Sequence, residues 1–249
     1  MNRSPLAHSP TFSPLYRQIR ALLTYGLESG EWRPGDMIPS ESELAVRFGV
    51  SQGTVRKAID EMAAENLLVR RQGKGTFVAT HHDPRSFFRY LRLAANDGEL
   101  QALVSVPLEC WRAKAGIDVA RTLAVAPGAP IIIARQVLRF GGEAAVFDEI
   151  YLPGELFPDL TLDILQSCEM SLYSLFESRY GVCTVRADER LRAVAADRVS
   201  AGILQVAEGS PLLLVERITY SHASKPVEWR RGYYSTQNFH YHNELGSGR

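Results

Sequence analysis

The sequence predicts an α+β protein: an N-terminal winged helix-turn-helix, followed by a C-terminal domain built on an antiparallel sheet. Two observations carry this prediction. Residues 39–78 have the pattern of two short helices and a basic hairpin, and residues 120–133 recur as residues 201–214 with the same turn signals. The chain has 249 residues, 45% of them hydrophobic, which is enough to form one or two domains with buried cores.

The first helix is expected to begin at Ser13-Pro14 and to stop near Gly30. Pro34-Gly35 then turns the chain toward the motif. Apolar spacing predicts that this helix buries a stripe of four side chains, Leu15, Ile19, Leu22 and Leu23.

The next two helices carry clear start and stop signals. Ser40 and Glu43 have the spacing of a capping box, which predicts a helix from Glu41, and Gly49 fits the left-handed position after its end. Ser51 can cap the following helix. The buried positions of that helix are expected to be Val55, Ala58, Ile59 and Met62.

The outward face of this helix carries side chains that can bond to DNA bases. Gln52 and Arg56 lie one helical turn apart, and Gln and Arg can bond bidentately to adenine and guanine. Strands are predicted over residues 67–71 and 76–78, and their basic residues suit phosphates or the minor groove. Although the chain is formally neutral, residues 47–74 hold six Lys and Arg against three Asp and Glu. Similar helix spacings occur in proteins that bind no DNA, but the caps, the polar face and the basic hairpin together favour DNA binding.

The second domain contains an internal repeat with an offset of 81 residues. The residues that recur unchanged are Ala120, Leu123, Val125, Ala126, Gly128 and Pro130. Each copy predicts a short helix, a Gly-x-Pro turn and a long strand, with a second strand returning over residues 144–152 and 226–234. The result should be a pseudo-twofold α+β domain. The duplication can simply build one core, or the related halves can enclose a ligand cleft, and both can hold.

Between the copies, a helix is expected from Ser171 to just before Gly181. Residues 182–195 alternate like a strand, with a charged face that is most simply solvated. The predicted boundaries are a disordered arm over 1–12, the winged domain over 13–79, a polar linker over 80–86 and the second domain over 87–245. Aromatic residues of 87–90, just after the linker, are candidates for coupling the two domains.

Three cysteines, Cys110, Cys168 and Cys183, fit no metal spacing and are expected to be reduced thiols, as in a cytoplasmic protein. No apolar run approaches the ~20 residues that span a bilayer, and the N-terminus has no signal-peptide pattern, so no membrane partner is expected. No metal site and no cofactor are predicted.

These motifs resemble those of the GntR family of bacterial transcription regulators, in its HutC-type branch with a UTRA effector-binding domain. In the first domain the matching segments are Leu15-Tyr16, Pro34-Gly35-Asp36, Pro39-Ser40-Glu41, Thr54-Val55-Arg56 and Gly73-Lys74-Gly75-Thr76-Phe77-Val78. In the second they are Gly128-x-Pro130, Tyr151-Leu152-Pro153, Ser171-Leu172-Tyr173, Gly209-x-Pro211 and Pro226-Val227-Glu228. The resemblance covers nearly the whole chain.

The resemblance implies a cytoplasmic, nucleoid-associated homodimer that binds a short inverted repeat in double-stranded DNA. It also implies that the second domain shares the fold of chorismate lyase and binds a small-molecule effector. The implied mode of regulation is repression that the effector releases. A transcription activator of the same architecture is the alternative. A lyase-type enzyme is disfavoured, since the sequence has no nucleophile-plus-base motif, metal cluster or phosphate loop, and fold does not carry function.

Many relatives carry Arg where this chain has Ser42 and Gln52, whereas Arg56 keeps the family residue and is expected to be a principal DNA contact. The predicted DNA-binding residues are Ser40, Ser42, Ser51, Gln52, Gly53, Thr54, Arg56, Lys57, Arg71, Gly73, Lys74 and Gly75.

Phosphosugar-sensing relatives hold phosphate with an Arg-x-Arg pair, but those positions here are Gln136 and Leu138, with Arg135 on the opposite face. The sequence therefore favours a different small polar ligand. Its predicted contacts are Asp148, Ser171, Glu228, Arg230 and Tyr234. The alternative is structural: Glu228 and Arg230 pair with neighbouring strands, and Ser171 caps its helix.

Overall fold

The computed structural model describes residues 13–65, 67–80, 91–98, 102–168, 170–221 and 225–243. The chain divides into two compact units, residues 1–79 and residues 80–249. The predicted arm over 1–12, all but the first residue of the predicted linker, and the aromatic residues of 87–90 lie outside the described residues.

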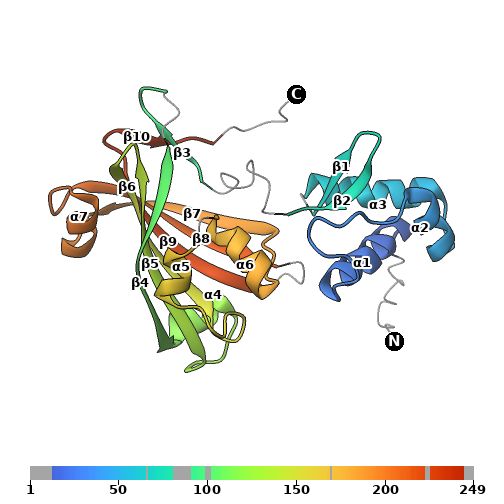
Figure 1. Cartoon of the computed structure of the whole chain (residues 1–249), viewed down its shortest axis with the longest axis horizontal. Helices are drawn as coiled ribbons and strands as arrows, with labels where there is room; N and C mark the ends of the chain where they lie inside the picture. Colours follow the sequence, from blue (N-terminus) through green and yellow to red (C-terminus); the bar gives the residue numbers. More distant parts are fainter. Residues whose placement is uncertain are drawn as a thin grey trace, which may run out of the picture. The chain divides into compact units, whose positions relative to one another are not determined.

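The first unit contains three helices and a two-stranded antiparallel hairpin (Figure 1). The elements are α1 (Leu15–Glu28), α2 (Glu41–Phe48), α3 (Gln52–Ala64), β1 (Leu68–Arg71) and β2 (Gly75–Val78). The predicted caps are confirmed. Ser40 and Glu43 form a complete capping box, Gly49 ends α2 with φ +66°, and the Ser51 side chain accepts a hydrogen bond from the Thr54 backbone N–H.

The core of this unit lies between α1 and α3, and the four apolar positions predicted on α3 are all buried. The prediction for α1 is half wrong. Ile19 and Leu23 are buried, but Leu15 and Leu22 are 58% and 49% exposed. The packed stripe continues instead to Leu27, so Leu22, which lies about 100° around the helix from Leu23, points away from α3.

The second unit is built on a six-stranded antiparallel sheet in the order β4-β5-β6-β9-β8-β7. Its strands are β4 (Leu103–Lys114), β5 (Pro130–Phe140), β6 (Glu143–Pro153), β7 (Arg186–Ala195), β8 (Pro211–Tyr220) and β9 (Pro226–Ser235). Its helices are α4 (Ile117–Leu123), α5 (Leu162–Gln166), α6 (Leu172–Tyr180) and α7 (Arg198–Leu204). A small separate ribbon pairs β3 (Leu93–Ala95) with β10 (Phe239–Tyr241).

The predicted pseudo-twofold repeat is confirmed and is longer than the sequence indicated. The unit β4-α4-β5-β6 recurs as β7-α7-β8-β9, with β6 and β9 paired at the centre of the sheet. The turns repeat in detail, since the Ala115 N–H donates to the Ala129 carbonyl and the Ala196 N–H donates to the Ser210 carbonyl, both at 2.8 Å. The offset of 82 along β6 and β9 makes Glu149 and Arg231 equivalent, and they face each other, so the pseudo-twofold axis passes between them.

The sequence did not predict β3, β4, β10 or α5, and the strand predicted over 182–195 begins only at Arg186. The long edge strand β4 is largely part-exposed and carries Pro107 at a register shift, so its apolar residues form no regular alternation.

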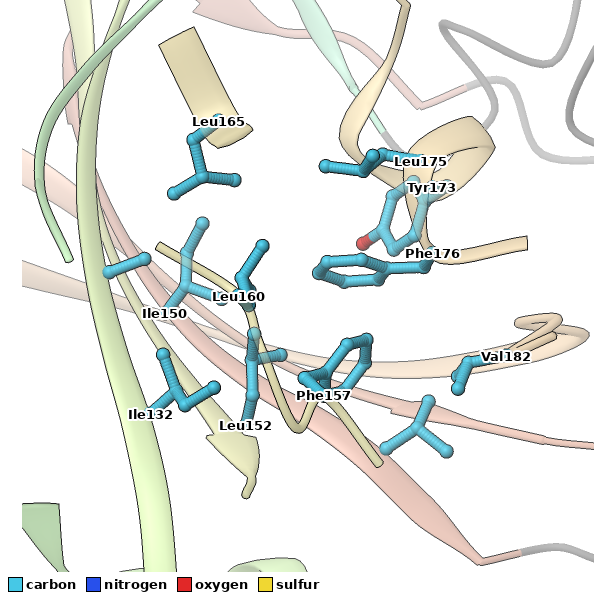
Figure 2. Close-up of a cluster of buried hydrophobic side chains, with 12 residues drawn as sticks. Ile132, Ile150, Leu152, Phe157, Leu160, Leu165, Tyr173, Leu175, Phe176 and Val182 are labelled. Atoms are coloured by element: carbon cyan, nitrogen blue, oxygen red, sulfur yellow. The ribbon is translucent and has the colours of Figure 1, made fainter. Parts of the chain in front are cut away.

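The two faces of the sheet are covered by different helices. Helices α5 and α6 pack on one face through a cluster that includes Ile132, Ile150, Phe157 and Phe176 (Figure 2). Helices α4 and α7 pack on the other face, against Ile131 and Val137 of β5 and Ala144 and Phe147 of β6. The face that α4 and α7 cover also carries a row of charged side chains, one from each of the six strands, whose charges alternate in sign. They are Glu109, Arg135, Glu149, Arg231, Glu216 and Arg190.

Two non-glycine residues, Ala124 and Gln205, end α4 and α7 in the left-handed region, with φ of 52° and 57°. A left-handed conformation costs an L-residue roughly 1–2 kcal/mol, whereas glycine costs about 0.4–1 kcal/mol through the unfolded chain. Ala124→Gly and Gln205→Gly should therefore each raise the free energy of unfolding by about 0.5–1 kcal/mol in urea denaturation. Ala126→Gly, where φ is not positive, should lower it. Equal losses in all three variants would show that these two turns store no strain.

Candidate functional site

A groove in the first unit lies between the start of α2, the start of α3 and the tip of the β1–β2 hairpin. Seven predicted DNA-binding residues line it: Ser40, Ser42, Gln52, Arg71, Gly73, Lys74 and Gly75. The other five are Ser51, Gly53, Thr54, Arg56 and Lys57, which lie on the cap and first turns of α3 beside the groove. All twelve are exposed except Thr54, which is half-buried, so the surface is available to a partner.

Glu41 organises this surface, a role that was not predicted from the sequence. One of its carboxylate oxygens accepts hydrogen bonds from Arg56 at 2.9 Å and from Gln52 at 3.4 Å. The other oxygen lies 2.9 Å from a nitrogen of Arg70 on the hairpin. Burial alone would raise the pKa of Glu41, but the hydrogen bonds from Arg56 and Arg70 outweigh it, and the pKa lies below its ordinary value. The carboxylate thus stays charged and ties the hairpin to the second and third helices.

The hairpin is also fixed at its base. Residues 35–38 run beside β2, with hydrogen bonds from Gly35 N–H to the Val78 carbonyl and from Ile38 N–H to the Thr76 carbonyl. At the turn, Gly73 and Gly75 adopt φ of +70° and +114°, which only glycine adopts readily. This backbone presents Lys74 at the tip of the hairpin.

A second candidate site is a pocket of about 90 Å³ between the sheet of the second unit and helices α5 and α6. Four predicted ligand contacts line it, Asp148, Ser171, Arg230 and Tyr234, together with Gln136 and Leu138. As expected, Arg135 lies on the opposite face, where it bonds to Glu149. The strand alternation that the sequence predicted therefore holds on β5.

The polar centre of the pocket is an ion-pair network. Arg230 donates from Nη1 to Asp148 Oδ2 at 3.0 Å and from Nε to Glu228 Oε1 at 2.5 Å. Gln136 donates from Nε2 to the same Asp148 oxygen at 2.9 Å. Burial alone would lower the pKa of Arg230, but the charges of Glu228 and Asp148 outweigh it and hold the pKa above its ordinary value. Burial also raises the pKa of Tyr234 to about 12, so its phenol is neutral at neutral pH.

The fifth predicted contact, Glu228, does not line the pocket. Its side chain is fully buried and sits beneath Arg230, where it also lies 3.5 Å from the Thr219 hydroxyl. Glu228 therefore positions Arg230 rather than facing the cavity.

Arg217 was not predicted from the sequence. Its side chain is 4% exposed, lines the pocket and donates from Nε to Glu189 at 2.6 Å. The repeat contained the signal that would have found it. Arg217 is the equivalent of Gln136 at the offset of 81, just as Arg230 is the equivalent of Asp148 at the offset of 82. The pocket is thus lined by two pairs of repeat-related residues, which the separate inspection of each strand did not reveal.

Helix α6 closes the pocket with its first turn. Ser171 caps the helix, since its Oγ accepts from the Ser174 N–H at 3.1 Å, and it lines the cavity as well. Farther along the helix, Glu177 accepts a hydrogen bond from the hydroxyl of Thr80, the first residue of the second unit. One rigid element therefore connects the pocket to the point where the chain enters this unit.

Within the described part of the chain, no helix is both long and apolar enough to cross a membrane. The same residues hold no group of three His, Cys, Asp or Glu side chains arranged to bind a metal ion.

Two family models match the chain. The model for bacterial regulatory proteins of the gntR family matches residues 15–78, and the UTRA domain model matches residues 103–240. Similar proteins include the HTH-type transcriptional repressor NagR of Bacillus subtilis, which is 29% identical over 239 residues, or 93% of this chain and 96% of that protein. The histidine utilization repressor of Pseudomonas putida is 27% identical over 212 residues, or 84% and 83% of the two chains.

Solved structures agree with these matches. The ligand-binding domain of a proposed GntR-family transcriptional regulator from Bordetella bronchiseptica is 43% identical, with a TM-score of 0.62, and the match covers 64% of this chain and 98% of that domain. PhnF from Mycobacterium smegmatis has the same fold at 24% identity and a TM-score of 0.51, over 88% and 95% of the two chains.

The buried network makes a prediction about stability. Arg230→Ala leaves Asp148 and Glu228 buried without their shared cation, which should cost about 3–5 kcal/mol in the free energy of unfolding. The control is Arg121→Ala, because Arg121 lies on α4, outside the row of alternating charges, and its ion pair with Asp118 is exposed, at 76% and 86% of the two side chains. The control should cost less than about 1 kcal/mol. If urea denaturation gave equal losses for the two variants, the ion-pair network would not be what makes Arg230 important.

Proposed function

The chain belongs to the GntR family of bacterial regulatory proteins and carries a UTRA domain, and on that premise we propose that it is a cytoplasmic homodimeric repressor whose operator affinity a small polar ligand alters. The family consists of DNA-binding transcription regulators, not enzymes. The observation that carries the proposal is the presence, in one chain, of an exposed polar recognition helix and a separate buried polar pocket. Repression is preferred to activation because several relatives that span most of this chain are named repressors.

For DNA, we propose that α3 enters the major groove while the hairpin contacts the backbone or the minor groove. Gln52 and Arg56 project from the exposed face of α3, and Lys74 stands at the hairpin tip. A dimer would place two such surfaces on the halves of an inverted repeat. The row of alternating charges on the sheet suits pairing with a second copy, because the row is self-complementary when turned end to end.

The first test is selection from genomic DNA. The full-length protein would be mixed with sheared DNA of its source organism, and the bound fragments sequenced. Enrichment of one short palindrome would support the proposal, and the neighbouring genes would suggest ligands. If nothing were enriched with or without cell extract, specific DNA binding would be rejected.

Arg56 should dominate base recognition. Arg56→Ala is expected to weaken binding to the selected operator by about 1–3 kcal/mol at fixed salt, because a bidentate base contact is lost. The matched control is Arg20→Ala, since Arg20 pairs with Glu61 and Glu65 between α1 and α3, away from the groove. Fluorescence anisotropy would measure both variants, and unchanged affinity of the Arg56 variant would remove this residue from the interface.

The effect of ligand binding on operator affinity can be transmitted through α6. Because its first turn lines the pocket and Glu177 holds Thr80, a ligand that shifts α6 would alter the position of the chain as it leaves the second unit. The other candidate route, through residues 87–90, lies outside the described residues and stays a prediction. The ligand would then shift the balance between forms that match the operator spacing and forms that do not.

Thr80→Val tests this route, since it removes the hydroxyl and keeps the shape. Affinity for ligand, and for operator without ligand, should stay within about twofold of wild type, while the effect of ligand on operator affinity should fall by about 0.5–2 kcal/mol. Thr122→Val is the control, because that hydroxyl bonds only locally, to the Asp118 carbonyl in α4. Full ligand response in the Thr80 variant would exclude the route.

A further inference from the structure

We infer that the ligand of the second unit is a small amphoteric molecule that carries both a carboxylate and an N–H donor. The inference rests on the proposed function, because it assigns the chemistry of the proposed effector. It concerns ligand binding alone, however, and can be tested without DNA.

Two buried polar atoms at the pocket have no hydrogen-bond partner, and they are of opposite kinds. Asp148 Oδ1 is an unused acceptor, and Arg230 Nη2 is an unused donor. Their residues are 1% and 7% exposed, so bulk water does not satisfy them. Leaving such charged groups without partners is unfavourable, and one ligand that offers a donor and an acceptor would satisfy both.

The donor side of the pocket favours a negatively charged acceptor. Arg217 lines the cavity beside Arg230, so two guanidinium groups face the same space. The first turn of α6 adds backbone N–H groups, which carry the positive end of the helix dipole. A carboxylate bound between Arg230 and this turn would receive charge-assisted hydrogen bonds.

The acceptor side favours a cationic N–H group. Two buried carboxylates, Asp148 and Glu228, and a partly exposed third, Glu189, face two buried guanidiniums, Arg217 and Arg230. A ligand hydroxyl could bond to Asp148 Oδ1 but would leave the excess negative charge, whereas a protonated nitrogen would offset it. The same excess disfavours a phosphate dianion, in agreement with the absence of the Arg-x-Arg pair.

The pocket also limits the size of the ligand. A cavity of about 90 Å³ suits a molecule of amino-acid size better than a disaccharide or a nucleotide.

The test is calorimetry on the full-length protein with a panel of α-, β- and γ-amino acids and N-heterocyclic carboxylic acids. For each binder, the analogue without the carboxylate and the analogue without the nitrogen are titrated as well. Each truncation should weaken binding about 10- to 100-fold, since each leaves one buried charged partner unsatisfied. Inorganic phosphate and glucose 6-phosphate represent the competing class.

Asp148→Asn should lower the preference for the binder over its nitrogen-free analogue at least about tenfold. This ratio is measured within one variant, so partial unfolding does not change it. Asp118→Asn, at an 86% exposed side chain on α4, is the matched control and should keep the wild-type ratio. The inference is overturned if no member of the panel binds, if the sugar phosphate binds more tightly, or if the ratio is unchanged in the Asp148 variant. Operator binding that persists in any of these cases leaves the DNA-binding proposal intact.

Discussion

The antiparallel pairing of β6 with β9 is the constraint on which the second unit depends. It joins the two copies of the repeat into one sheet, with Glu149 facing Arg231 at the axis. The same register places Asp148 opposite Gly232 and Ile150 opposite Arg230. Asp148 and Arg230 are therefore diagonal neighbours on one face, within reach of a long side chain. Because they are also repeat-equivalent, the duplication itself brings this position into contact with its own copy. Opposite charges at the two copies give the 3.0 Å ion pair that forms the centre of the pocket.

The two copies of the repeat have the same backbone geometry but carry different polar residues at equivalent positions. On the pocket face, Gln136 and Asp148 of the first copy correspond to Arg217 and Arg230 of the second. On the other face, an Arg–Glu pair of β5 and β6 corresponds to a Glu–Arg pair of β8 and β9, which produces the alternating charges across the sheet. A buried ion pair is a poor source of net stability, because desolvation offsets most of the attraction. The network at Arg230 is thus better explained by ligand binding than by stability, because it leaves a charged donor and a charged acceptor at one small cavity.

Local signals made most of the fold predictable. Ser40 with Glu43, Gly49, and the repeated Gly-x-Pro turns depend on neighbours within a few residues, and each formed as expected. Strand alternation placed Gln136 on the pocket face and Arg135 on the other, as expected, but Arg217 was not found because each strand was considered without its repeat partner. Ligand binding by these residues stays a prediction. Tertiary packing decided the remainder. Three features depend on which element packs opposite, and the spacing of residues along the chain does not encode this. They are the orientation of α1 that exposes Leu22, the burial of Glu228 and the contacts of Glu41 with Arg56 and the hairpin.

Glu41 illustrates how a carboxylate can assist a surface that binds a polyanion. Its pair with Arg56 is largely exposed on the arginine side, at 57%, so breaking it costs up to about 1 kcal/mol, whereas a bidentate contact to guanine contributes about 1–3 kcal/mol of discrimination. In the proposed complex, the Arg56 guanidinium can therefore leave Glu41 to bond to DNA, or bond to both. Before binding, the pair limits the rotamers of a side chain whose ordering otherwise costs up to roughly 2 kcal/mol. If Arg56 contacts a base as proposed, Glu41 therefore lowers the entropic cost of that contact. Arg56 is the one guanidinium among the twelve predicted contacts that lies on the recognition helix, so this effect of Glu41 concerns the main candidate for base recognition.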